Sequence, residues 1–210
     1  MSGIPTYLRR YTDLPGLLHL LTTKQITLLD PMTWDDRNDS FFMSLYKDRK
    51  YLKSVLALCF SQSPETYHHW RVYSNGPAGA CIVFNRKSLL RSLTSVAGVS
   101  TGHVKYLTLK AAERRTFDVD ELPFVKRNGF KPETEFRALF VSKKEEKFSL
   151  QVPIEVAAIR SISLSPWMHG SLANSTIAAI RAIDGCKKLR VSRSTLISNE
   201  KWKALGRNAS

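Results

Sequence analysis

The chain has 210 residues, of which 43% are hydrophobic and 24% are charged, and its formal net charge is +14. This composition is that of an ordinary globular protein and excludes a disordered or fibrous chain, while the length suits a single domain over residues 1–210. No apolar run approaches the roughly 18 residues that cross a bilayer, so we expect a cytoplasmic protein with no membrane partner.

The first half of the sequence predicts short strands and helices in alternation. Asp13 has the residue type of an N-cap, and Pro15 suits the first turn of the helix that follows it. The expected elements are strand 7–11, helix 14–23, strand 26–29, a polar loop at 34–39 with a helix after it, strand 54–61, helix 64–73 and strand 79–84.

The second half continues the mixture, and nothing in its composition marks a domain boundary. Residues 134–141 alternate between apolar and polar side chains, which is typical of a half-buried strand. The expected elements are helix 86–93, strand 103–109, helix and loop over 110–129, strand 134–141, strand 156–164, helix 175–183 and strand 189–191. This order predicts an α+β fold and not a doubly wound sheet.

Positive charge is concentrated toward the C-terminus. Residues 1–80 hold nine basic and seven acidic side chains, which leaves 23 basic and 11 acidic over residues 81–210, a net charge of +12. Such a surface attracts polyanions, so RNA or single-stranded DNA is the expected partner. Aromatic residues that could stack on unpaired bases interleave these charges, although a core role explains them as well; they are Tyr106, Phe117, Phe124, Phe130 and Trp202.

Two glutamates, Glu133 and Glu135, form the sharpest local pattern. Two positions apart on a strand, they point the same way with Cα atoms about 7 Å apart. One carboxylate of such a pair can orient a hydroxyl while the other stabilises positive charge at a sugar carbon. A solvated strand face, with Arg137 paired to a glutamate, is the structural alternative.

Arginines on the first strand could bind a pyrophosphate through parallel hydrogen bonds. Adjacent side chains on a strand point to opposite faces, so we expect either Arg9 or Arg10 to face inward, and we favour Arg10.

A metal site is the rival interpretation. Asp35, Asp36 and Asp39 could hold a hard cation together with Glu133, as in a metal-dependent nuclease, although capping of the next helix explains them equally. His68 and His69 diverge by about 100° on a helix and cannot easily share a metal. A non-enzymatic nucleic-acid-binding or regulatory module is the third interpretation.

Several segments together resemble a bacterial family known as a domain of unknown function, which itself looks like a distant branch of the ADP-ribosyltransferases. The resemblance implies a split mixed sheet flanked by helices, with NAD as the substrate. It also implies an Arg or His from the first strand, a Ser or Tyr from a middle strand and a late Glu. The segments are LRRYTDL (8–14), LLDPMTWDDRND (28–39), LCFSQSPETYHHW (58–70), GACIVF (79–84), LPFVKRNGFKPETEFR (122–137) and ISLSPW (162–167).

Carried over residue by residue, the resemblance places Arg10 on the pyrophosphate, Ser61 at the nicotinamide ribose and Glu135 at the transition state. Glu133 takes the place of the residue that activates the acceptor. The chain departs from the family pattern at the middle strand, where Ser61-Gln62-Ser63 stands in place of a Ser-Thr-Ser triplet.

The resemblance further implies that an aromatic side chain stacks on nicotinamide, and the candidates are Tyr11, Trp34 and Tyr73. It implies a mono-ADP-ribosyltransferase toxin that modifies nucleic acid, with RNA preferred over DNA. An antitoxin protein would hold the toxin inactive, and phage infection would release it.

Overall fold

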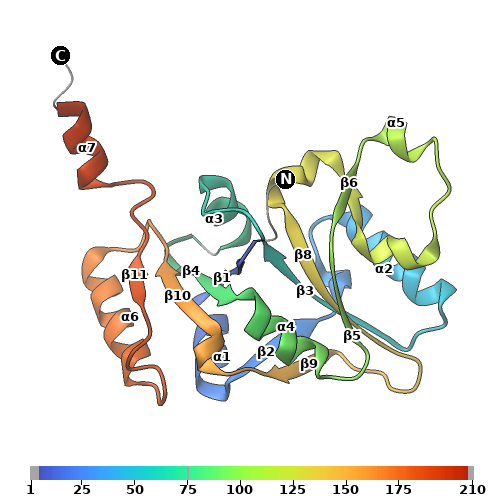
Figure 1. Cartoon of the computed structure of the whole chain (residues 1–210), viewed down its shortest axis with the longest axis horizontal. Coiled ribbons are helices and arrows are strands. Elements are labelled where there is room, and N and C mark those ends of the chain that lie inside the picture. Colours follow the sequence, from blue (N-terminus) through green and yellow to red (C-terminus); the bar gives the residue numbers. More distant parts are fainter. Residues whose placement is uncertain (1–4, 75, 208–210) are drawn as a thin grey trace.

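The computed structural model describes residues 5–74 and 76–207. Within these residues nine strands form one mixed sheet flanked by helices (Figure 1), which confirms the predicted α+β class. The strands are β1 (Tyr7–Asp13), β2 (Gln25–Leu29), β3 (Ser54–Ser61), β4 (Gly79–Asn85), β5 (Val99–His103), β8 (Glu135–Ser142), β9 (Ser149–Pro153), β10 (Ile159–Leu164) and β11 (Val191–Arg193).

The sheet has the order β11-β10-β4-β1-β3-β2-β9, and β8 joins it by pairing with both β3 and β5. All of these pairs are antiparallel except β10 with β11. Over the described residues β1 and β3 share one register pair, Arg9 opposite Ser61, whereas β1 and β4 share seven and β3 and β8 share eight. Strands β2 and β3 likewise share one pair, Leu29 opposite Ala57, so the sheet splits along the edge of β3 that faces β1 and β2.

Helices flank the sheet. The helices of the described residues are α1 (Leu14–Thr23), α2 (Arg37–Arg49), α3 (Tyr67–Tyr73), α4 (Arg86–Thr94), α5 (Leu109–Ala112), α6 (Gly170–Ala182) and α7 (Glu200–Arg207). As expected, Asp13 caps α1, where its carboxylate accepts a hydrogen bond from the Gly16 backbone N–H at 2.8 Å. None of the described helices combines the length and the apolarity that a bilayer span requires.

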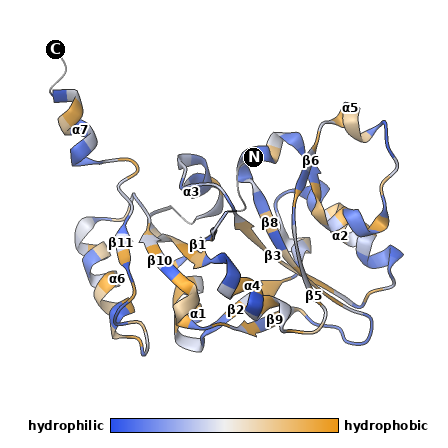
Figure 2. Cartoon of the chain, viewed as in Figure 1, coloured by the Kyte–Doolittle hydropathy of each residue, from blue (hydrophilic) through white to orange (hydrophobic). Residues whose placement is uncertain are grey.

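The central strands β3 and β4 are apolar because both of their faces are buried (Figure 2). One cluster joins α1 and α4 to β1, β3, β4 and β10, and includes Leu8, Leu21, Phe60 and Leu89. A second cluster lies under α2 and the 3-10 helix η3 (Val119–Phe124). Strand β3, with the sequence SVLALCFS, contributes to both, which explains its continuous apolar run.

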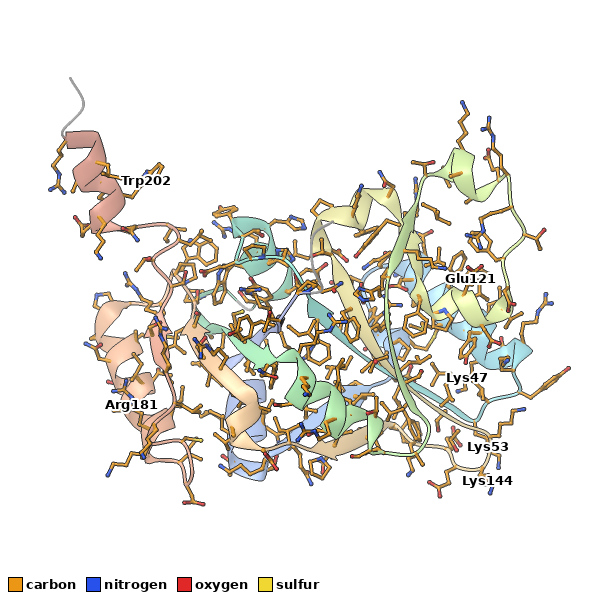
Figure 3. The ribbon with its side chains drawn as sticks, viewed as in Figure 1. Lys47, Lys53, Glu121, Lys144, Arg181 and Trp202 are labelled. Atoms are coloured by element: carbon orange, nitrogen blue, oxygen red, sulfur yellow. The ribbon has the colours of Figure 1, made fainter. Side chains whose placement is uncertain are left out.

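Several parts of the chain differ from expectation. The predicted strand 103–109 is two strands, because β5 ends at His103 on the main sheet and β6 (Lys105–Leu107) pairs with β7 (Val125–Arg127) in a separate parallel sheet. Residues 156–158 of the predicted strand 156–164 form a 3-10 helix. Helix α7, which the sequence analysis did not predict, projects away from the body (Figure 1), and its Trp202 side chain is 77% exposed (Figure 3).

Candidate active site

A cavity of about 990 Å³ opens where β1 and β3 part. Its volume is at the upper end of the range for small-molecule sites. The walls come from β1, β2 and β3, from the loop before α2, from the end of α3 and from the segment around the two glutamates. All seven residues predicted for catalysis or NAD binding line this cavity: Arg10, Tyr11, Trp34, Ser61, Tyr73, Glu133 and Glu135.

The two glutamates flank a sharp turn and do not lie on one strand. Glu133 ends the 3-10 helix η4 (Asn128–Glu133), Thr134 has φ 44° and ψ 51°, and β8 begins at Glu135. A β-branched residue in this left-handed region costs about 1–3 kcal/mol. The Gln62 backbone N–H, which donates to the Thr134 carbonyl at 3.0 Å, helps to hold the turn against that strain.

Lys126 on β7 brings the two carboxylates together. Its ammonium lies 2.8 Å from Glu133 Oε2, 3.5 Å from Glu135 Oε2 and 3.6 Å from Asp39 Oδ2, and its side chain is 9% exposed. Burial opposes the charge, but the carboxylates of Glu135 and Glu133 outweigh it and raise the pKa of Lys126. The lysine is therefore a permanent cation between the glutamates.

Arg137 on β8 binds the same acidic cluster from the protein interior. Its fully buried guanidinium donates to both Asp39 carboxylate oxygens at 3.0 and 2.8 Å, and to Glu135 Oε1 at 2.8 Å. Burial would raise the pKa of Glu135, yet Arg137 and Lys126 hold it below its usual range. Glu135 is thus an anion despite being only 5% exposed.

Ser61 at the end of β3 has its hydroxyl in a buried network. Ser61 Oγ donates to the Glu133 carbonyl at 2.9 Å and lies 3.0 Å from His69 Nε2. Since burial lowers the pKa of His69, the ring is neutral, and because the hydroxyl proton is directed at Glu133, Nε2–H is the donor to Ser61. This leaves Nδ1 to accept from Thr66 Oγ1, 2.5 Å away.

Both arginines of β1 line the cavity. Arg9 Nη1 donates to the Ser63 carbonyl at 2.8 Å, and Arg10 Nη1 donates to the Cys59 carbonyl at 3.3 Å. Burial lowers the pKa of Arg10, but an arginine stays protonated in proteins. Both arginines therefore border the cavity, and the role of Arg10 in binding a pyrophosphate remains a prediction.

The three aromatic candidates differ in how far they are already engaged. Tyr11 stacks on His69, with ring centroids 5.3 Å apart, and is 7% exposed. Trp34 lies over the Arg137 guanidinium at 4.8 Å. Tyr73 is 38% exposed, and burial of its hydroxyl together with the Glu133 carboxylate raises its pKa. Tyr73 therefore presents the most accessible ring of the three.

Three of the four acidic residues of the rival metal site, Asp36, Asp39 and Glu133, have other partners. Asp36 caps α2, accepting from the Asn38 and Asp39 backbone N–H groups at 3.1 and 3.4 Å, as its sequence position predicts. Asp39 pairs with Arg137, and the ammonium of Lys126 lies within 3.6 Å of Asp39 and Glu133. Across residues 5–74 and 76–207, no three His, Cys, Asp or Glu side chains converge to hold a metal ion.

The proposed base-stacking residues lie in different surroundings. Phe130 lines the cavity, whereas Phe117 and Phe124 pack in the second core cluster. The Tyr106 hydroxyl accepts from the Glu135 backbone N–H at 2.8 Å. The basic residues are also spread over the periphery, with Arg181 and Lys144 at opposite ends of the molecule (Figure 3).

Three features of the site were missed in the sequence analysis: Lys126, the Asp39–Arg137 pair and His69 as the partner of Ser61. The residue types of Lys126 and Arg137 could have pointed to their role, because a Lys and an Arg within twelve positions of two glutamates suggest charge pairing. Asp39 lies 98 positions from Arg137, and no local pattern joins them.

No family model matches the sequence, and a search of curated proteins finds no match. Among solved structures, DarT of Thermus sp. 2.9 in complex with carba-NAD+ is 12% identical, with 92% of this chain and 97% of that chain covered and a TM-score of 0.47. The same protein in complex with NAD+ is 12% identical, with 92% of this chain and 98% of that chain covered and a TM-score of 0.46. In complex with ADP-ribosylated ssDNA it is 11% identical, with 90% of this chain and 94% of that chain covered and a TM-score of 0.45. The resemblance to the bacterial family stays an expectation, and the proposal below rests on the residues of the cavity.

Proposed function

We propose that the protein is an NAD-dependent mono-ADP-ribosyltransferase that modifies nucleic acid. The observation that carries the proposal is the convergence in one cavity of an arginine from β1, a serine from β3 and the two glutamates on either side of the turn that leads into β8. These side chains come from both sides of the split in the sheet.

The charges of the cavity suit NAD, which carries an anionic pyrophosphate and a cationic nicotinamide ring. Arg9 and Arg10 supply positive charge on β1. The acidic cluster consists of Asp36, Asp39, Glu133 and Glu135, while its cations are Lys126 and Arg137, so carboxyl groups outnumber cations by two. An excess of negative charge in a buried site stabilises positive charge that develops there.

In this proposal Arg10 binds the pyrophosphate and Ser61 helps to position the nicotinamide ribose. Glu135 stabilises positive charge at the ribose carbon while the bond from that carbon to the nicotinamide nitrogen breaks. The electron pair of that bond stays with the nitrogen, so nicotinamide leaves neutral. The carbon then bonds to an acceptor atom, whose proton Glu133 accepts.

Single-stranded nucleic acid is the proposed acceptor, and RNA is preferred over DNA. The support is the net charge of +12 over residues 81–210 and the aromatic ring of Phe130 in the cavity wall. A basic enzyme that modifies nucleic acid would harm its host, so we also propose a toxin that is held by an antitoxin protein and acts in phage defence. Growth arrest on expression, relieved by Glu135→Ala, is the test of this role.

The activity is tested by incubating the protein with labelled NAD and either an RNA or a DNA oligonucleotide. Label should enter one of them, and Glu135→Ala should lower the rate at least about a hundredfold, the usual effect of losing one preorganised electrostatic contact. Equal labelling by wild type and Glu135→Ala would contradict the assignment. A wild type that binds oligonucleotides but transfers no label would favour a non-enzymatic binding module.

A further inference from the structure

We infer that Lys126 is a positioning residue that fixes Glu133 and Glu135 relative to each other for the transfer reaction. This inference rests on the proposed function and concerns a residue that has no role in the scheme above. Lys126 comes from β7, which lies outside the main sheet, and it reaches across to both glutamates.

The geometry of the turn explains why such a residue is needed. Glu133 ends η4 and Glu135 begins β8, with the left-handed Thr134 between them, so no regular element fixes both side chains. Each carboxylate accepts a contact from the same ammonium, at 2.8 and 3.5 Å. Arg137 holds the other oxygen of Glu135 at 2.8 Å, and Lys126 is the cation that links Glu135 to Glu133, two side chains that the backbone leaves independent.

The ammonium also separates like charges. Without it, Glu133 and Glu135 would face each other and the Asp39 carboxylate across a buried space, with Arg137 as the remaining cation of the cluster. Like charges so close repel, and the side chains would rotate apart or one carboxylate would take up a proton. Either change removes the arrangement in which Glu135 faces the ribose while Glu133 faces the acceptor.

Lys126 is itself held in place. Its side chain is 9% exposed, and its ammonium lies 4.6 Å from the centre of the Phe130 ring, within the range of a cation–π contact. The charged and titratable side chains around the cluster, from every element packed against it, are Asp36, Asp39, Cys59, Tyr73, Tyr106, Glu133, Glu135 and Arg137.

The first arm of the test compares Lys126→Met and Lys126→Arg with the wild type. Lys126→Met should lower kcat by roughly a hundredfold while the dissociation constant for NAD, measured by calorimetry, changes less than about threefold, because the substrate-binding side chains remain. Lys126→Arg restores the cation and should recover much of kcat. The matched control is Lys110→Met, which removes an exposed cation from the same segment of the chain, the one that connects β5 to β8.

The second arm needs no NAD and therefore separates this inference from the proposed function. Melting temperatures are measured for Lys126→Met, for Glu133→Gln with Glu135→Gln, and for all three changes together. If Lys126 acts through the glutamates, its substitution should lower the melting temperature of the wild type far more than that of the double glutamine variant.

Equal effects of Lys126→Met in the two backgrounds would overturn the inference. The inference would also be overturned if Lys126→Met keeps a normal kcat although its effect on the melting temperature depends on the two glutamates. A wild type that shows the coupling but neither cleaves NAD nor transfers ADP-ribose from it would overturn the proposed function, and with it the catalytic meaning of the cluster.

Discussion

Substitution of Arg137 by methionine tests the buried ion cluster on which the site depends. The change removes the guanidinium that donates to Asp39, to Glu135 and, at 2.6 Å, to the Pro123 carbonyl. Removing one partner of a buried ion pair costs about 3–5 kcal/mol. For a protein of this size each kcal/mol lowers the melting temperature by about 2–4 °C, so we expect a drop on the order of 6–20 °C at neutral pH.

The destabilisation should depend on pH in a defined direction. In the wild type the pKa of Glu135 is held below its usual range, so its contribution to stability is present at neutral pH and is lost as the pH falls below about 4. In Arg137→Met, burial without the guanidinium favours the protonated form of Glu135. Acidification should therefore destabilise the variant less than the wild type, and the difference between their melting temperatures should become smaller.

Thermal melting followed by circular dichroism at neutral and acidic pH measures both effects. Arg207→Met, which removes an exposed cation on α7, is the control and should leave the melting temperature unchanged. A drop of less than about 2 °C for Arg137→Met, or a gap that widens on acidification, would refute the view that this cluster is a set of paired, ionised groups.

Three further predictions concern ligands. NAD at about a hundredfold over its dissociation constant should stabilise the fold by roughly 2.7 kcal/mol, which is measured as a rise in melting temperature. Arg10→Ala should reduce this rise, whereas Glu135→Ala should largely preserve it. If NAD does not raise the melting temperature of folded wild type, the NAD site is contradicted. Affinity for a single-stranded oligonucleotide, measured by fluorescence anisotropy, should fall steeply between about 50 and 200 mM salt, whereas a flat response would remove the nucleic-acid acceptor. A chelator should leave NAD consumption unchanged, because Lys126 supplies the cation of the acidic cluster; loss of activity that added metal restores would revive the nuclease interpretation.

Elements whose periodicity is strong could be predicted from the sequence. The run 54–61 is observed as a strand with the expected bounds, and the helix after Asp13 begins and ends where its cap and spacing indicate. Strand 103–109 could not be resolved, because nothing local shows that the chain leaves one sheet at Val104 and enters another. Strand β9 was not predicted, because only one of its five residues is buried and its sequence therefore carries little of the apolar pattern of a strand.

The residue types of the candidate site could also be predicted, but their geometry could not. Residue spacing placed Glu133 and Glu135 on one strand, whereas Thr134 adopts a left-handed conformation that only its surroundings stabilise. The contact of Lys126 with four carboxylates depends on the docking of β7 beside α2, which is a tertiary event. Roles in catalysis remain predictions for all of these residues.

The single register pair between β1 and β3 among the described strands has a mechanical consequence. Two plates of the sheet carry the site, β11-β10-β4-β1 with Arg10 and β3-β8-β5 with Ser61 and Glu135, and the seam between them is poor in backbone hydrogen bonds; β2-β9 forms a third plate, joined to β3 by the single pair Leu29–Ala57. A molecule that bound Arg10 at one end and Glu135 at the other would fasten the plates together. We expect amide hydrogen exchange along the ends of β1 and β3 to slow when such a molecule binds, while exchange within β4 and β8 stays the same.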